Sequence, residues 1–137
     1  MNMKKCRALG WMAGAMLVLA GCAMLGGAPV KYSGGVLVND AGMTLYTFDK
    51  DPAGAGKSVC NAQCAAVWPP LKATAEDKPG GDYTIITRDD GGKQWAYKGK
   101  PLYLWIKDQK PGDRTGDGFN KVWHVVKEES QPMWSGY

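Results

Sequence analysis

Two cysteines and one histidine are the side chains of this 137-residue chain that most directly suggest chemistry. Cys60 and Cys64 are separated by three residues, and His124 is the only histidine. In an oxidising compartment, two such thiols usually form a disulfide. If the segment is helical, their Cα atoms lie about 6 Å apart, within disulfide range. The alternative is a soft Cu(I) site in which Cys60, Cys64 and His124 are the ligands.

The spacing of this copper alternative resembles the Cys-x-x-x-Cys and distant histidine of envelope copper chaperones of the Sco type. The chain lacks the proline after each cysteine and the alternating strand and helix pattern of their thioredoxin-like fold. Thiol redox catalysis has less support, because the spacing is not Cys-x-x-Cys. His124 follows Trp123 in an apolar stretch, where a single histidine is more often structural than a ligand. We therefore expect a disulfide and no cofactor, with copper or thiol redox chemistry as the alternative.

Other catalytic patterns are missing from the sequence. There is no Gly-x-Ser-x-Gly motif and no glycine-rich phosphate loop. The loop 108–120 holds several aspartates and glycines, which is reminiscent of a calcium loop. If Asp113 is the first ligand, His124 stands where the bidentate glutamate belongs, so that pattern fails. We expect a turn-rich connector there, and a protein without enzymatic activity.

The first 22 residues carry a targeting signal. Three basic residues precede an apolar run of 12 residues over 9–20, which is too short to cross a hydrocarbon layer of roughly 30 Å. The run ends in Leu19-Ala20-Gly21-Cys22, which resembles the lipobox of bacterial lipoproteins. The resemblance implies cleavage before Cys22 and its diacylation with fatty chains such as palmitate. Two or three acyl chains exceed the limit of reversible one-chain binding, so we expect a lasting membrane anchor.

This signal divides the chain into a signal peptide (1–21), a lipidated Cys22 with a flexible tether (22–33), one domain (34–127) and a C-terminal tail (128–137). Removing the leader leaves 14 basic against 13 acidic residues, so the net charge falls from +4 to +1. A nearly neutral domain argues against a nucleic-acid groove. Ala23 resembles an outer-membrane sorting signal, which implies a periplasmic orientation in a host with two membranes. The expected partners are the membrane and an envelope protein or polymer.

The composition favours short strands over long helices, because 19 Gly and 8 Pro punctuate the chain. Segments rich in β-branched and aromatic residues predict strands over 36–38, 43–48, 83–87, 93–97, 102–106 and 122–127. Turn residues at 39–42, 89–92 and 98–100 predict hairpins. Only 59–67 suits a short helix, which Trp68-Pro69-Pro70 would end. We expect a small, mainly β domain of antiparallel strands with at most one short helix.

The domain repeats itself. Residues 42–51 align without gaps on 99–108 at an offset of 57, with identical Gly, Leu, Tyr and Asp. Further on, Val-Trp at 67–68 matches Val-Trp at 122–123 at an offset of 55. The sequence therefore predicts two tandem copies, over about 34–71 and 83–127.

The repeated motif resembles that of bacterial predicted lipoproteins with the Yx(FWY)xxD motif, also described as a secreted repeat of unknown function. The six motif positions are Tyr46, Phe48, Asp51, Tyr103, Trp105 and Asp108. The Cys60-x-x-x-Cys64 spacing, the Trp-Pro-Pro-Leu at 68–71 and the Pro-Gly-Asp at 111–113 also fit. The resemblance implies an envelope lipoprotein domain without an assigned activity.

In a strand, residues two apart share a face, so Tyr46 joins Phe48 and Tyr103 joins Trp105. Leu45 and Leu102 then point the opposite way. We expect the aromatic pairs to build the core; the alternative is an exposed surface that stacks on a sugar or another envelope polymer. The two aspartates, Asp51 and Asp108, follow their strands and are expected to accept backbone N–H groups of the next loop.

Overall fold

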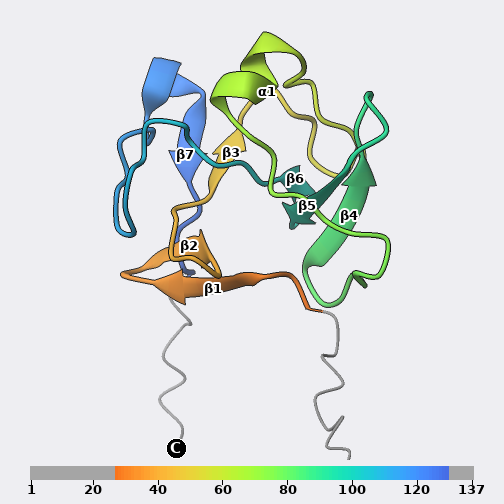
Figure 1. Ribbon diagram of the computed structural model, residues 1–137, viewed down its shortest axis with the longest axis horizontal. Coiled ribbons are helices and arrows are strands. Elements are labelled where there is room, and N and C mark those ends of the chain that lie inside the picture. The colour runs from red at the N-terminus through yellow and green to blue at the C-terminus, as the bar shows by residue number, and fades with distance from the viewer. Residues whose placement is uncertain (1–26, 130–137) are drawn as a thin grey trace, which may run out of the picture.

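The computed structural model describes residues 27–129, shown in colour in Figure 1. Its elements are β1 (Val30–Ser33), β2 (Val36–Asn39), β3 (Tyr46–Phe48), α1 (Gln63–Val67), β4 (Tyr83–Thr87), β5 (Lys93–Tyr97), β6 (Lys100–Pro101), the 3₁₀ turn η1 (Phe119–Lys121) and β7 (Trp123–Val125). All strand pairs are antiparallel and form three small sheets, β1-β2, β3-β7 and β4-β5-β6. The predicted mainly β fold with one short helix is confirmed. Over the residues described, no helix has the length and apolarity needed to cross a membrane.

Tight turns build the hairpins. Lys98 and Gly99 both have positive φ (49° and 79°) and join β5 to β6, the geometry in which a two-residue turn matches strand twist. The Arg88 N–H donates to the Gly92 carbonyl (2.8 Å) and closes the turn between β4 and β5. The Gly42 N–H donates to the Asn39 carbonyl (2.9 Å). All three predicted turns are therefore present.

The two repeats exchange their ends. The strand β7 comes from the second repeat but pairs with β3 of the first, and the two lie side by side in Figure 1. The Leu37 N–H in the first hairpin donates to the Val126 carbonyl of the second repeat (2.8 Å). Reciprocally, the Trp95 N–H in the second hairpin donates to the Leu71 carbonyl of the first (2.9 Å). Each repeat thus completes the sheet of the other.

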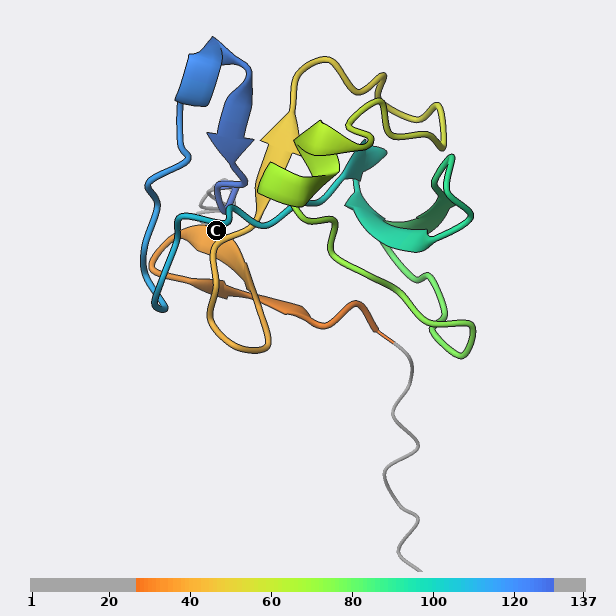
Figure 2. The same ribbon diagram turned by 45° about the horizontal axis from the view of Figure 1, so that its top comes forward.

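The exchange centres on the two motif tyrosines. Tyr46 and Tyr103 face each other in an antiparallel bridge, and each backbone N–H donates to the other's carbonyl at 2.8 and 2.9 Å. Their side chains enter an aromatic core, whereas Leu45 and Leu102 enter a second core with Leu37, Leu71 and Trp95. In Figures 1 and 2, α1 lies close to β3.

Several predicted elements need correction. The strand expected over 43–48 is regular only over β3, and the strand expected over 122–127 only over β7. Residues 30–33 were expected to belong to the tether (22–33), but they form β1, because their backbone pairs with β2 in the hairpin. The segment 102–106 is not a regular strand, although Leu104 and Ile106 donate to the Pro69 and Val67 carbonyls. Proline has no N–H, so the 69–70 segment cannot return the bonds of a continuous ladder. The helix begins only at Gln63.

Two predictions fall outside the described residues. The signal peptide (1–21) with the lipidation site Cys22 is one, and the C-terminal tail beyond residue 129 is the other.

Candidate functional site

The repeated motif forms two crossed hydrogen bonds. The Tyr46 hydroxyl donates to Asp108 Oδ2 (2.6 Å), and the Tyr103 hydroxyl donates to Asp51 Oδ2 (2.5 Å). Both tyrosines are fully buried, and both aspartates are at least nine-tenths buried. Each motif tyrosine is therefore bonded to the motif aspartate of the other repeat.

The second carboxylate oxygen of each aspartate binds the loop of its own repeat. Asp51 Oδ1 accepts the Val59 N–H (2.8 Å). Asp108 Oδ1 accepts the Thr115 N–H (3.0 Å) and the Thr115 hydroxyl (2.6 Å). The Asp side chain therefore ties a loop of one repeat to the tyrosine of the other, and the motif acts as a clamp between the copies.

Four aromatic rings stack in a column inside this clamp. Phe48 lies on Trp123 (centroids 4.3 Å apart), Trp123 on Trp68 (3.8 Å) and Trp68 on Trp105 (3.9 Å). The order is symmetric, because Phe48 corresponds to Trp105 and Trp68 to Trp123 in the repeat alignment. All four rings are buried. The alternative in which the motif aromatics form an exposed stacking surface is therefore wrong.

Burial affects the titration of the clamp. It raises the pKa of Tyr46 and of Tyr103, and the hydrogen bonds to Asp108 and Asp51 raise them further. Burial also raises the pKa of Asp51, which the Tyr103 hydrogen bond and the Val59 N–H partly oppose. Both phenols consequently remain protonated donors at neutral pH.

Cys60 and Cys64 form a disulfide with a Cα–Cα distance of 5.2 Å. His124 is engaged elsewhere, with Nε2 at 2.8 Å from Asp49 Oδ2. Within residues 27–129, no three or more His, Cys, Asp or Glu side chains gather where they could hold a metal. The ligand set of the copper alternative is thus not brought together.

The aspartates of the 108–120 loop are occupied by backbone donors. Asp113 Oδ2 accepts the N–H groups of Gln109 and Lys110, and Asp117 Oδ1 accepts that of Val125. These bonds make the loop a connector braced by its own carboxylates.

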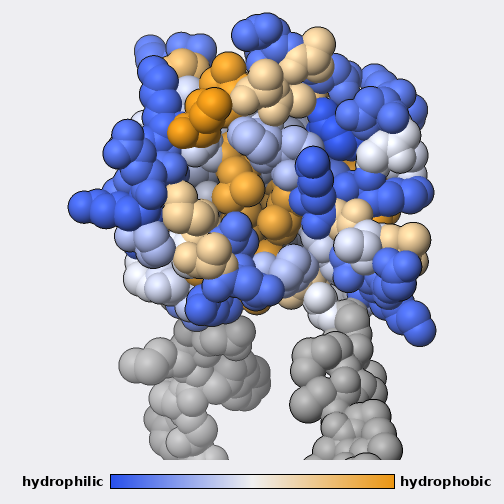
Figure 3. Space-filling view, in the orientation of Figure 1, coloured by the Kyte–Doolittle hydropathy of each residue, from blue (hydrophilic) through white to orange (hydrophobic). Residues whose placement is uncertain are grey.

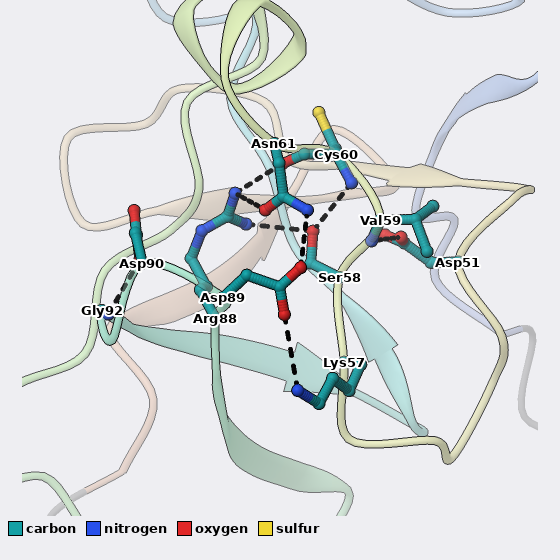
Figure 4. A network of polar contacts seen from close by, with 10 residues as sticks. All are labelled: Asp51, Lys57, Ser58, Val59, Cys60, Asn61, Arg88, Asp89, Asp90 and Gly92. Carbon is teal, nitrogen blue, oxygen red and sulfur yellow. Dashed lines mark hydrogen bonds and ion pairs between the residues drawn. The ribbon is translucent and has the colours of Figure 1, made fainter.

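A buried arginine, Arg88, lies beside the disulfide and escaped the sequence reasoning (Figure 4). Its Nη1 donates to Ser58 Oγ (3.0 Å) and to Gln94 Oε1 (2.7 Å), and its Nη2 donates to the Cys60 carbonyl. Ser58 Oγ also contacts the Tyr103 hydroxyl, so Arg88 joins the crossed clamp on one side. Arg88 is a single basic residue before an Asp-Asp-Gly-Gly turn, and nothing in that pattern distinguishes it from a solvated side chain.

The other clamp has a different neighbour. Ser58 contacts the Tyr103 hydroxyl in the first clamp. At the corresponding position of the second clamp, the Gly116 N–H donates to the Tyr46 hydroxyl (3.3 Å). No arginine contacts Tyr46 or Asp108 within the described residues. The approximate symmetry of the fold is broken at Arg88.

A surface cavity of about 360 Å³ adjoins Arg88 and is the candidate functional site. Both repeats contribute to its lining, which consists of Pro70, Lys72, Ala73, Arg88, Asp90, Gly92 and Lys93. Three of these residues are basic and one is acidic. The chain segment 70–73 reaches this place only because the repeats exchange their ends.

Comparison with known proteins supports the repeat. Residues 30–72 and 84–127, more than half of the chain, match the family model described as a secreted repeat of unknown function. No curated protein and no solved structure matched the chain. The two matched segments coincide with the two interlaced copies of the fold. The chain therefore belongs to this family of secreted repeats and contains two copies of the repeat.

Proposed function

We propose that this protein is a lipid-anchored, non-enzymatic binding module of the bacterial cell envelope. The observation that carries the proposal is that the side chains of the repeated motif are buried and bonded to one another inside the molecule. Its tyrosines and aspartates form the crossed clamp, and its other aromatic rings form the buried column. A motif whose side chains are all buried in structural contacts indicates a scaffold, so we expect ligands to bind on the surrounding surface.

That surface is mostly hydrophilic. Charged and polar groups cover much of the face in Figure 3, around a smaller apolar area. Over the described residues, the exposed large apolar side chains are Val59, Ile106 and Phe119. A surface of this kind suits contact with polar or charged envelope components, and the cavity next to Arg88, lined by three basic residues and one acidic residue, is a place where such contact can occur.

The anchor is supported by the Leu19-Ala20-Gly21-Cys22 sequence and agrees with the secreted character of the family. The first strand begins at Val30, eight residues after Cys22. Eight extended residues span at most about 28 Å, so an acylated Cys22 would hold the domain close to the bilayer. In a host with two membranes, Ala23 favours the outer membrane and a domain facing the periplasm.

Inhibition of lipoprotein signal peptidase tests the anchor. In bacteria expressing the full chain, globomycin should accumulate a precursor that retains residues 1–21, and radiolabelled palmitate should enter the protein. The Cys22→Ser variant should incorporate no palmitate, and a variant of another cysteine, Cys6→Ser, should label normally. Normal processing under globomycin with release of an unlabelled soluble product would overturn the anchoring proposal.

A further inference from the structure

We propose that the cavity lined by Lys72, Arg88 and Lys93 binds the phosphate group of an anionic ligand. The inference names a ligand for the proposed binding module and rests on that function, but it does not depend on the lipid anchor.

Arg88 is a buried cation with no carboxylate in direct contact among the described residues. Its side chain is 4% exposed, and it forms no ion pair over the residues described. Its hydrogen-bond acceptors are neutral, namely a hydroxyl, two amide oxygens and a backbone carbonyl. Its Nε has no hydrogen-bond partner within residues 27–129. Asp51 partly offsets this charge, because it is linked to Arg88 through Tyr103 and Ser58 and the two charges interact. A buried cation without a carboxylate in direct contact still favours the arrival of an anion.

The cavity also carries two lysines at its rim. Lys72 and Lys93 are both exposed and lie on neighbouring chain segments, because the Ala73 N–H donates to the Lys93 carbonyl (3.0 Å). Lys93 Nζ donates to Thr87 Oγ1 (2.6 Å), and neither lysine forms an ion pair in the described part of the chain. Two ammonium groups at the rim therefore remain available to an anion.

The charge of the cavity favours a phosphate group over a single carboxylate. The lining carries three positive groups and the Asp90 carboxylate, one of whose oxygens accepts the Gly92 N–H (2.8 Å). The lining residues sum to +2, part of which Asp51 offsets at Arg88. A phosphate, with a charge of about −1.5 to −2 and three acceptor oxygens, neutralises such a positive site more fully than a single carboxylate does. Arginine and lysine are also the side chains that usually bind phosphate.

The site occurs once per chain despite the internal repeat. At the offset of 57, Arg88 corresponds to Lys31, which is exposed in β1, and Lys93 corresponds to Val36. The first repeat therefore lacks both the buried guanidinium and one rim lysine. We expect one phosphate per molecule.

Calorimetric titration of the full chain, purified in a non-ionic detergent, tests this site with inorganic phosphate as the probe. The wild type should bind phosphate at 1:1 stoichiometry. The Lys72→Gln/Lys93→Gln variant should lose about tenfold or more in affinity, since charged hydrogen bonds are removed. The matched Lys50→Gln variant, which changes an exposed lysine away from the cavity, should bind like wild type. Because Arg88→Gln affects a buried network, the exposed lysine variants keep the test independent of folding.

Acetate and vesicles complete the experiment. Acetate that binds as tightly as phosphate, an absence of phosphate binding, or equal loss in Lys50→Gln would overturn the proposal. Binding to phosphatidylcholine vesicles only when they contain phosphatidic acid, abolished in the double lysine variant, would identify a lipid headgroup. Binding of free phosphate without such vesicle binding would identify a soluble phosphate ester. Failure of phosphate binding with normal globomycin sensitivity would reject this site and leave the anchor intact.

Discussion

Removal of one tyrosine hydroxyl can distinguish a clamp that joins the two repeats from a clamp within one repeat. The Tyr46→Phe substitution removes only the hydroxyl that donates to Asp108 Oδ2. It also deprives the Gly116 N–H of its acceptor. Asp108 then keeps the Thr115 donors on Oδ1, but its buried Oδ2 loses its partner.

The magnitude follows from the chemistry of that bond. Loss of a hydrogen bond to a charged group costs about 1.5 to 3 kcal/mol in free energy of unfolding, and leaving a buried acceptor unpaired belongs to the same range. Tyr103→Phe should cost a similar amount, because Asp51 Oδ2 loses its Tyr103 donor while Oδ1 keeps the Val59 N–H.

Double-mutant cycles measured by urea unfolding give the assay. Tyr46→Phe combined with Asp108→Ala should show a coupling energy of about 1 to 3 kcal/mol, as expected for groups in direct contact. The control cycle combines Tyr46→Phe with Asp51→Ala, the aspartate of the same repeat, and should be additive within about 0.5 kcal/mol. Strong coupling in the control cycle and none in the crossed cycle would show that each tyrosine pairs with the aspartate of its own repeat.

Three further predictions concern the same core. Burial raises the pKa of Tyr46 and Tyr103 in the folded protein above the unfolded value of about 10. The stability that these hydroxyls contribute should therefore be complete below pH 10 and be lost as the pH rises above it. A melting temperature that does not fall above pH 10 would contradict this prediction. Replacing both Cys60 and Cys64 by Ala should lower the unfolding free energy by about 2 kcal/mol and keep the fold, as judged by circular dichroism, because the closed loop is short. In Gly116→Ala, the new Cβ would lie 2.7 Å from Trp68 Cη2 and 3.0 Å from Trp105 Cγ. This overpacking should lower the free energy of unfolding by about 1 to 3 kcal/mol and alter tryptophan fluorescence. Unchanged stability would mean that the aromatic column is packed more loosely than these distances indicate.

Local patterns made much of this fold predictable. The gapless alignment at an offset of 57 revealed the duplication, and two-residue alternation placed Leu45 and Leu102 opposite the aromatic rings. Glycine-containing turns located the hairpins because positive φ values are restricted to few residue types. Turns and strand alternation depend on residues that are close together in the sequence, so the sequence alone predicts them.

The exchange between repeats was not predicted, since identical motifs make pairing within and between copies look alike. One signal was available. Tyr46 and Asp51 are five residues apart, about 16 Å along an extended strand, so these two side chains are poorly placed to meet. The partner of each tyrosine had to come from elsewhere, and the other copy carries the same aspartate.

The candidate cavity had no such signal. Its residues come from two separate segments of the chain, 70–73 and 88–93, and Lys72 reaches Lys93 only through the exchanged ends. The burial of Arg88 depends on Ser58, Gln94 and the Cys60 carbonyl, which only the tertiary structure brings together.

Separation of the two repeats tests the interlaced architecture most directly. Fragment 22–78 lacks β7 and fragment 79–137 lacks β3, and both lose the Leu37–Val126 and Trp95–Leu71 backbone bonds, so neither should fold as a monomer. Mixing them should restore the amide spectrum of the intact chain in a 1:1 complex, measured by NMR together with light scattering. A dispersed, folded spectrum from either fragment as a monomer would show that one repeat folds without the other and that the architecture is not interlaced.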